Sequence, residues 1–400
     1  MSEYNYNDLS SFLINWQNNT KYFDMLRLMA QLSKLFSESE VPYLDYRLAE
    51  NLFCKYYKAA NDARSCTAYD ARLMHLGIGI KTFILKGKEG EYSTEKIAEF
   101  NKLKKTLNPL KGKDLAIQIA KYRNERMQFA NDQYDVNETQ YHIVGRIEGA
   151  LRLFNTPYDE VDIDNLCLEK DDETSCSFHD GKNEYTFNKS KSVLQKKFYL
   201  PKEFKDISIE ILEDPLDLLE SFFSTNKKEI ISAKKLQRGI DYVILPLYSY
   251  SKTKGYYVAE KSGLNQFNAG GRKRNELEVY IPVPMAIHKS FPSFFPSRDI
   301  PFSLILPDGK ILSAKICQDG GKALMSNPNK DLGEWILRKV LKKEPWKLVS
   351  MDDLNRLGFD SVCIESLHTI DENGMPLYRI SFSNMNENYQ TFINEGLEDS

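Results

Sequence analysis

Residues 67–85 read TAYDARLMHLGIGIKTFIL and predict the two strands of a β-hairpin. A polar break that contains His75 separates the short first run, TAYDA, from the longer apolar run GIGIKTFIL. Asp70 ends the first predicted strand, and Lys81 lies within the second. The hairpin therefore brings a carboxylate and a lysine onto paired strands, and the interpretation of the N-terminal half depends on this pair.

Helical patterns flank the hairpin on both sides. Apolar residues at helical spacing predict two helices within residues 22–62, one helix over about 94–107 and another over about 113–132. Residues 140–198 return to short strand-like runs around turn signals. This order of elements predicts a mixed α/β domain.

Beyond residue 240 the helical periodicity largely disappears. Short β-type runs, such as YVILPLYSY and KILSAKIC, alternate with Gly, Pro, Asn and Asp, and one helix is expected over about 332–342. This pattern is typical of a β-barrel or sandwich. We expect a mixed α+β protein in four parts: an α/β domain over 1–205, a connector over 206–239, a β-domain over 240–385 and an acidic tail over 386–400.

Composition limits the class of protein. The 400 residues are 42% hydrophobic, enough for more than one core, so intrinsic disorder is not expected. With 54 Lys+Arg against 57 Asp+Glu, any nucleic-acid site must be a local patch. The cysteines form no CxxC pair, and we see no secretory leader and no apolar run of the ~18 residues that a membrane span needs. We therefore expect a cytoplasmic protein with no membrane partner.

Several catalytic signatures are absent. The chain has no HxK motif, which excludes a phospholipase-D-type nuclease, and no HExxH motif. It also lacks GxxxxGK[ST] and a GxGxxG that opens a βαβ unit, so neither nucleotide-driven chemistry nor a methyltransferase is indicated.

The Asp70 and Lys81 pair suits a metal-dependent phosphodiesterase. A carboxylate can hold Mg²⁺, which lowers the pKa of a bound water, while an ammonium group stabilises the charge that develops on the phosphate. The alternative is an exposed aspartate at the end of a hairpin and a lysine whose stem lies along its edge. These two residues alone leave both interpretations open.

The spacing of Asp70 and Lys81 resembles the PD-(D/E)xK nucleases. The longer stretch SCTAYDARLMHLGIGIKTF (65–83), followed by EKIAEFNK (95–102), is similar to the catalytic segment of certain type II restriction endonucleases. The resemblance implies a restriction-endonuclease-like α/β fold, Mg²⁺ as cofactor and a catalytic role for Asp70 and Lys81.

This sequence departs from the family pattern at Gly79, where the second acid usually stands two residues before the lysine. Some restriction endonucleases of this superfamily carry that acid on the neighbouring helix, which here offers Glu95 and Glu99 one turn apart. Glu50 is a further candidate, because it shares a predicted helix face with aromatic residues. A solvated helix face is the alternative for each glutamate. The expected catalytic residues are Asp70, Lys81, Glu50, Glu95 and Glu99, and the expected metal ligands are Asp70, Glu95 and Glu99.

A basic segment follows in the same half of the chain. Residues 178–198 read FHDGKNEYTFNKSKSVLQKKF, in which Lys189 and Lys191 suit contacts with DNA phosphates. The segment resembles one in the same group of restriction enzymes. The alternative is an ordinary basic surface.

Residues 262–284 read SGLNQFNAGGRKRNELEVYIPVP and combine a Gly- and Asn-rich arm with a strand. Arg, Asn, Gln and Glu side chains are those that read base edges in the major groove, although such a loop is more often only solvated. The expected DNA-binding residues of this arm are Asn265, Gln266, Asn268, Arg272, Lys273, Arg274, Asn275, Glu276 and Tyr280.

Together with residues 294–310 and 317–340, this segment resembles the DNA-recognition domain of EcoRII-type effector domains, a pseudobarrel shared with plant B-three transcription factors. In that fold two arms clamp the major groove. The resemblance implies a second arm at about 318–329, which offers Gln318, Asp319, Lys322, Asn327 and Asn329.

The sequence therefore predicts a type II restriction endonuclease that cuts duplex DNA at or near a short, asymmetric site. Because one recognition module reads one site but two strands must be cut, a homodimer or a transient pairing of nuclease domains is expected. A DNA methyltransferase is the expected genetic partner. The alternatives are a non-catalytic DNA-binding regulator with a degenerate nuclease domain, and an RNA-binding or structural module.

Overall fold

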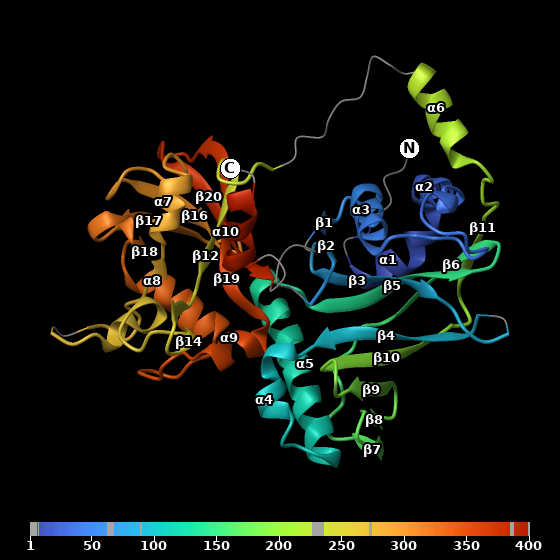
Figure 1. Cartoon of the computed structure of the whole chain (residues 1–400), viewed down its shortest axis with the longest axis horizontal. Coiled ribbons are helices and arrows are strands. Elements are labelled where there is room, and N and C mark those ends of the chain that lie inside the picture. The colour runs from blue at the N-terminus through green and yellow to red at the C-terminus, as the bar shows by residue number, and fades with distance from the viewer. Residues whose placement is uncertain are drawn as a thin grey trace. The chain divides into compact units, whose positions relative to one another are not determined.

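The computed structural model describes residues 6, 8–61, 68–88, 90–225, 236–271, 274–384 and 388–398. The chain divides into two compact units, the first of which takes in most of the described residues up to 225, and the second those from 236 onward. Both units mix helices and strands, which confirms the expected α+β class (Figure 1). No helix in the described ranges is long and apolar enough to cross a membrane.

A six-stranded sheet forms the centre of the first unit, with its strands in the order β1-β2-β3-β5-β6-β11. Neighbouring strands are antiparallel except β3 and β5, which are parallel. The strands are β1 (Ala60–Asn61), β2 (Ala71–Leu73), β3 (Leu76–Ile84), β5 (Glu138–Ile147), β6 (Ala150–Pro157) and β11 (Lys205–Ser208).

Three helices cover one face of this sheet (Figure 1). They are α1 (Leu9–Asn15), α2 (Thr20–Gln31) and α3 (Tyr46–Tyr57), accompanied by the short 3-10 turns η1 (Trp16–Asn18) and η2 (Ser33–Leu35). Their buried side chains, including Phe12, Tyr22 and Phe53, form one core with Ile78 and Ile80 of β3. The expected pair of helices within residues 22–62 is thus confirmed as α2 and α3.

A second, antiparallel sheet has the strand order β4-β10-β9-β8-β7. Its strands are β4 (Tyr92–Glu99), β7 (Cys167–Asp171), β8 (Ser175–His179), β9 (Glu184–Asn188) and β10 (Val193–Tyr199). Helix α5 (Gly112–Tyr134) packs against this sheet in a separate core, together with η3 (Asn101–Leu103) and α4 (Lys104–Leu107). Phe198 of β10 contacts Phe83 and Tyr141 of the first sheet, so aromatic side chains fill the space between the sheets.

The second unit contains a seven-stranded sheet in the order β12-β19-β20-β16-β17-β18-β15. The strands are β12 (Tyr242–Pro246), β15 (Ile281–Pro282), β16 (Pro301–Ile305), β17 (Ile311–Cys317), β18 (Ala323–Ser326), β19 (Phe359–Ile370) and β20 (Pro376–Asn384). The two edge strands, β12 and β15, contact each other, so the sheet is nearly closed. This arrangement is consistent with the expected pseudobarrel.

Shorter elements complete the second unit. The hairpin β13 (Ser249–Ser251) and β14 (Gly255–Tyr257) leads to η4 (Gly263–Asn268), and η5 (Asp319–Gly321) connects β17 to β18. The remaining helices are α7 (Met285–Ser290), α8 (Lys330–Gly333), the π-helix η6 (Glu334–Val340), α9 (Met351–Leu357) and α10 (Tyr389–Glu398). The expected helix over 332–342 corresponds to α8 and η6.

The structure differs from the sequence expectations in four places. The first strand of the hairpin is β2 (Ala71–Leu73), so Asp70 precedes this strand and does not end it. Residues 94–99 are not helical but belong to strand β4, and only residues 101–107 form helical turns. Strand β11 lies in the range expected as a connector, which also contains α6 (Pro215–Thr225). Residues 389–398, expected within an acidic tail, form α10, because Phe392 is buried and places its ring 5.7 Å from that of Tyr242.

Candidate functional site

Asp70 and Lys81 come together at the start of the β2–β3 hairpin. Asp70 directly precedes β2, and its Oδ2 accepts a hydrogen bond from the backbone N–H of Ile80 at 2.7 Å. The same oxygen lies 3.8 Å from the Nζ of Lys81. Because the hairpin turn at Met74 and His75 is tight, with a positive φ at Met74, the register that creates this pair is fixed by the chain itself.

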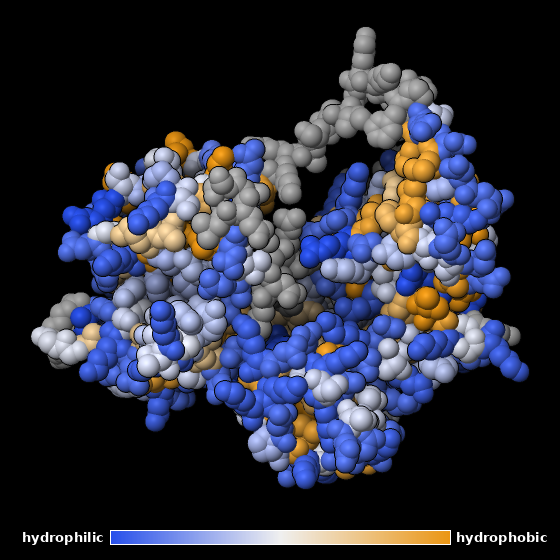
Figure 2. Space-filling model, in the orientation of Figure 1, coloured by the Kyte–Doolittle hydropathy of each residue, from blue (hydrophilic) through white to orange (hydrophobic). Residues whose placement is uncertain are grey.

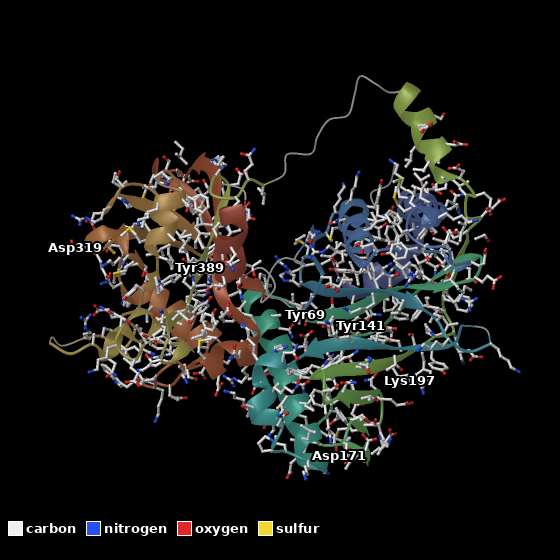
Figure 3. The ribbon with its side chains drawn as sticks, viewed as in Figure 1. Tyr69, Tyr141, Asp171, Lys197, Asp319 and Tyr389 are labelled. Carbon is white, nitrogen blue, oxygen red and sulfur yellow. The ribbon has the colours of Figure 1, made fainter. Side chains whose placement is uncertain are left out.

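Gly79 explains why the second acid of the expected motif is absent. A Cβ at this position would lie 2.7 Å from Tyr158 Cε1 and 2.8 Å from Tyr141 Cδ1. The two tyrosine rings stack with their centroids 3.9 Å apart, and the Tyr158 hydroxyl donates to the carbonyl of Ala68. Tyr69 and Tyr141, labelled in Figure 3, lie on the side of the first sheet that faces β4 and β10. A glutamate cannot occupy position 79 without displacing this stack.

Glu50 reaches the same region from α3. The helix begins after Asp45, whose side chain accepts hydrogen bonds from the N–H groups of Arg47 and Leu48. Glu50 is only 7% exposed, and burial, reinforced by the Asp70 carboxylate, raises its pKa to about 7. A buried carboxylate beside another carboxylate is costly for folding, and such sites are common where function requires them.

Glu95 reaches the site from the second sheet. It lies directly opposite Lys196 in the pairing of β4 with β10, so the two side chains share a face of the sheet. The hydroxyl of Ser93 donates to Glu95 Oε1 at 2.5 Å. The Asp70 carboxylate raises the pKa of Lys81, and Glu50 and Glu95 add to that shift against the opposing effect of burial. Three carboxylates from separate elements therefore act on one ammonium group.

Glu99 does not join this group. Ile97 is the extra residue of a β-bulge in β4, so Glu95 and Glu99 no longer share a face, as they would on an uninterrupted strand. Glu99 is exposed and accepts from Lys96 at 3.0 Å and from Asn101. The expectation that the two glutamates lie one helical turn apart is wrong, because residues 94–99 are extended.

The carboxylates of the site have the chemistry of Mg²⁺ ligands, which are hard oxygens. Within the described residues, no three His, Cys, Asp or Glu side chains lie close enough together to form a metal cluster. Mg²⁺ usually takes only one or two carboxylates, and waters and substrate phosphates complete its coordination. Asp70 with Glu50 or Glu95 fits that requirement.

Two buried cations flank the tyrosine stack. Arg123 of α5 is 3% exposed and lies over the ring of Tyr158, and Lys196 is 2% exposed and lies over the ring of Tyr141. Burial, reinforced by Arg123, lowers the pKa of Lys196 to about 8. Sequence reasoning treated Lys196 only as one lysine of a basic segment, because nothing in the chain marks which lysines of such a run point inward.

The two lysines of the first unit that were expected to contact DNA phosphates differ in their surroundings. Lys189 pairs with Asp171 at 2.7 Å, so its ammonium group is engaged within the unit, whereas Lys191 is exposed. A denser basic surface lies over η3, α4 and the first half of α5, where Figure 2 shows mainly hydrophilic side chains. It contains the exposed residues Lys102, Lys104, Lys105, Lys111, Lys113 and Lys121. The lysine-rich run KLKKTLNPLKGK could have indicated this surface.

Three residues of the first expected arm have internal roles in the second unit. Asn265 is fully buried: its Nδ2 donates to the carbonyls of Ala259 and Val349, and its Oδ1 accepts from the N–H of Val349. Arg274 pairs with Glu278 at 2.7 Å, and Glu276 pairs with Arg338 at 3.1 Å. The expectation that Asn265 reads a base is corrected, because its amide group is used inside the domain.

The other residues of this arm are more accessible. Asn268 and Asn275 are exposed, and Gln266 and Tyr280 are partly buried. Asn268 donates to the carbonyl of Glu260, and Asn275 accepts from the N–H of Leu277, so each still has free polar atoms. Arg272 and Lys273 lie outside the described residues.

The five candidate residues of the second expected arm are accessible, although strand β18 within the arm is buried. The exposed residues are Gln318, Asp319, Lys322, Asn327 and Asn329. Gln318 has a φ of 67°, which turns the chain sharply at the end of β17. Asp319 lies 3.4 Å from Arg298, which is itself exposed. Polar side chains are thus presented along this loop, as a groove-reading arm requires.

Residues 244–367 match the family of the NgoFVII C-terminal B3-like DNA-binding domain. The matched range runs from β12 into β19 and includes both expected arms. It supports the expected B3-like DNA-binding domain in the second unit and links the chain to restriction enzymes. No curated protein matches the chain.

Proposed function

We propose that this protein is a type II restriction endonuclease that cuts duplex DNA at or near a short, asymmetric sequence. The observation that carries the proposal is the approach of Asp70, Glu50 and Glu95 to Lys81 of β3 from three separate parts of the first unit. Four ionisable side chains are costly to hold near one another in a partly buried site, and a phosphodiesterase supplies a reason for doing so. The same chain carries a B3-like DNA-binding domain.

Lys81 stabilises negative charge in the proposed reaction. Because the neighbouring carboxylates raise its pKa, the ammonium group stays protonated at neutral pH. It therefore cannot accept a proton from water, but it can interact with the scissile phosphate as charge develops on its oxygens. Asp70 orients this ammonium group, and the Ile80 N–H holds the Asp70 side chain in place.

Mg²⁺ is the proposed cofactor, and Asp70 with Glu50 or Glu95 would hold it. When bound, it would supply Lewis acidity to the phosphate and lower the pKa of a bound water. Ser93 orients Glu95 through its hydrogen bond, and α3 presents Glu50 from a buried position. Since Glu99 lies on the opposite face of β4, we leave it out of the proposed metal site.

The second unit is proposed to select the sequence. The accessible side chains of the two arms would contact base edges. In the first unit, the exposed lysines of η3, α4 and α5 would contact phosphates of the DNA backbone. Because two strands must be cut, two copies of the first unit are expected to pair, as a homodimer or transiently. A DNA methyltransferase would protect the host genome, as restriction requires.

The proposal is tested by incubating the purified protein with unmethylated plasmid and phage DNA, with Mg²⁺ or with EDTA. Discrete fragments that require Mg²⁺ and disappear with Lys81→Ala are expected. Lys96→Ala is the matched control, because Lys96 is exposed on β4 and pairs with Glu99 on the opposite face from Glu95. Tight binding of duplex DNA without cleavage of any DNA would favour the non-catalytic regulator, and a preference for single-stranded RNA would favour the RNA-binding module.

A further inference from the structure

The second unit contains a half-open cavity of about 250 Å³ to which the proposed function assigns no role of its own. It is lined by the residues that connect β12 to β13 and the start of β13, by the segment that leads into η4, and by the chain around β15 and α7. At about 30 Å³ for each water, the cavity is roughly eight waters in size, which leaves room for one nucleobase.

The walls of the cavity are apolar and partly aromatic, and polar groups stand among them. Leu247, Val258 and Leu264 provide aliphatic contacts, and Tyr248 and Tyr280 provide rings. The hydroxyl groups of Ser249 and Ser262 are also among the lining groups. A flat heteroaromatic ring with polar edges matches such a lining, because its faces need apolar contact and its edges need hydrogen bonds.

Lys322 adds a cation to the same cavity. Its side chain is exposed, and it makes no ion pair with a described carboxylate. A ring that carries a phosphate would place negative charge near such a lysine. The cavity thus offers separate surroundings for the base and for the backbone of one nucleotide.

The position of the cavity connects it to the DNA-reading surface. Tyr280 is the last candidate residue of the first arm and Lys322 belongs to the second, so both arms contribute to the cavity lining. An aromatic row leads outward from it: the ring of Tyr248 is 5.2 Å from that of Tyr256, which is 5.1 Å from that of Tyr250. Tyr250 and Tyr256 are 63% and 51% exposed, so their rings are accessible to a flat ligand surface.

We propose that this cavity binds one nucleotide swung out of the duplex at or beside the recognised sequence. The inference rests on the proposed function, since it requires that the second unit bind duplex DNA. The exposed tyrosines of the β13–β14 hairpin would stack against the neighbouring bases after one base has left the helix. Specificity at that position would then come from the shape of the cavity rather than from contacts in the groove.

The experiment uses the full-length protein and duplexes that carry the recognised sequence, as mapped from the cleavage products or by selection for binding. 2-Aminopurine replaces one base at a time. A stacked 2-aminopurine is quenched, so its fluorescence is expected to rise several-fold at one position when protein binds. An abasic site opposite that position removes pairing that extrusion must break, and is expected to tighten binding about tenfold.

Ala259→Leu places a larger side chain in the cavity lining and is expected to abolish the fluorescence rise. The matched control is Ala286→Leu on α7, which does not line the cavity and should keep it. The duplex with the opposite abasic site tests the wild-type protein, so the proposal remains testable even if Ala259→Leu does not fold.

Two results would overturn the proposal. Tight duplex binding with no fluorescence rise at any position would remove the cavity from recognition while leaving the proposed restriction function intact. The second result is tight binding of free deoxynucleoside monophosphates, measured by calorimetry, that is lost in Ala259→Leu. If duplexes then show no fluorescence rise, the cavity binds a free nucleotide instead. A failure to bind any duplex would reject the proposed function together with this inference.

Discussion

Gly79 and Tyr158 approach so closely that a methyl group on Gly79 would lie 2.7 Å from Tyr158 Cε1. The strand that carries Lys81 therefore depends on the absence of a side chain two residues before the lysine. The stacked rings of Tyr141 and Tyr158 fill that space. In the proposed site, Glu95 of β4 or Glu50 of α3 would supply the carboxylate that position 79 cannot carry.

Gly79→Ala should destabilise the first unit by about 1–3 kcal/mol, because overpacking forces the rings or the strand to move. Urea denaturation measures the change. Gly270→Ala is the control, since a Cβ at Gly270 meets nothing within 4 Å and the change should stay within about 0.5 kcal/mol. Equal effects of the two substitutions would contradict the close packing at Gly79.

Glu95→Gln should reduce cleavage at least about 100-fold, because it removes a carboxylate that acts on Lys81 and would hold Mg²⁺ in the proposed site. Glu99→Gln should change the rate by no more than about twofold, since Glu99 is exposed on the opposite face of β4 and pairs with Lys96. Single-turnover rates of DNA cleavage with saturating Mg²⁺ provide the measurement. A larger loss in Glu99→Gln than in Glu95→Gln would reverse the assignment.

The contrast between Glu95 and Glu99 shows which parts of the candidate site can be predicted from the sequence. Lys81 and Glu50 lie on the elements that the sequence predicts, because apolar spacing and turn residues are local signals. Asp70, expected at the end of the first hairpin strand, instead lies directly before β2. The segment over 94–99 was misread as a helix, since polar and charged residues hide the alternation of a strand. The bulge at Ile97 that separates Glu95 from Glu99 depends on the pairing with β10, which is about 100 residues away in the chain.

In the second unit, too, local sequence patterns predict the elements but not the contacts between distant residues. Its alternating strands and its connection to a known domain family were visible in the sequence, and the nearly closed sheet agrees with them. Asn265 and Gln266 are neighbours in one polar arm, yet Asn265 is interior and Gln266 is partly exposed. The partner that fixes Asn265 is Val349, and no local pattern predicts so distant a contact.

Asn265→Ala should destabilise the second unit by about 1–3 kcal/mol, because three buried backbone groups lose their partner. Asn268→Ala should leave stability nearly unchanged, as Asn268 is exposed. Thermal denaturation of the two variants makes the comparison. If Asn265→Ala kept full stability but altered the recognised sequence, Asn265 would be a base-reading residue after all.

The free energy of unfolding should fall at acidic pH, because the unfolded chain binds a proton at His142 more readily than the folded chain does. This residue is fully buried, its Nδ1 donates to Asn155 at 2.8 Å, and its Nε2 accepts from the Tyr22 hydroxyl at 3.1 Å, an arrangement that requires neutral imidazole. Burial lowers its pKa to about 4, below the ordinary value near 6.5. The unfolded chain therefore binds the proton first, and stability is lost as the pH falls from 6.5 to 4, by about 3 kcal/mol in all.

Urea unfolding between pH 4 and 7.5 measures this dependence. His142→Gln should flatten the acid limb, whereas His179→Gln on β8, which is only partly buried, serves as the control. An acid limb that keeps its full slope in His142→Gln would assign the proton uptake to another group.

Glu50→Gln should separate stability from activity. The wild-type carboxylate is buried beside Asp70, so its ionisation becomes a growing penalty as the pH rises from about 4.5 to about 7, and the penalty stays constant above that. An amide of the same shape carries no charge, and the variant should gain on the order of 1–3 kcal/mol at pH 8 while losing Mg²⁺-dependent cleavage.

Thermal unfolding with and without Mg²⁺ tests the cause. A cation that binds only the folded chain raises the unfolding temperature, and Glu50→Gln should reduce that rise if Glu50 contributes to the site. Lys55→Gln, in the last turn of the same helix, controls for changes to α3. A variant that is less stable at pH 8 and responds to Mg²⁺ as the wild type does would mean that Glu50 has a structural role, and Glu95 with Asp70 would be left to hold the metal.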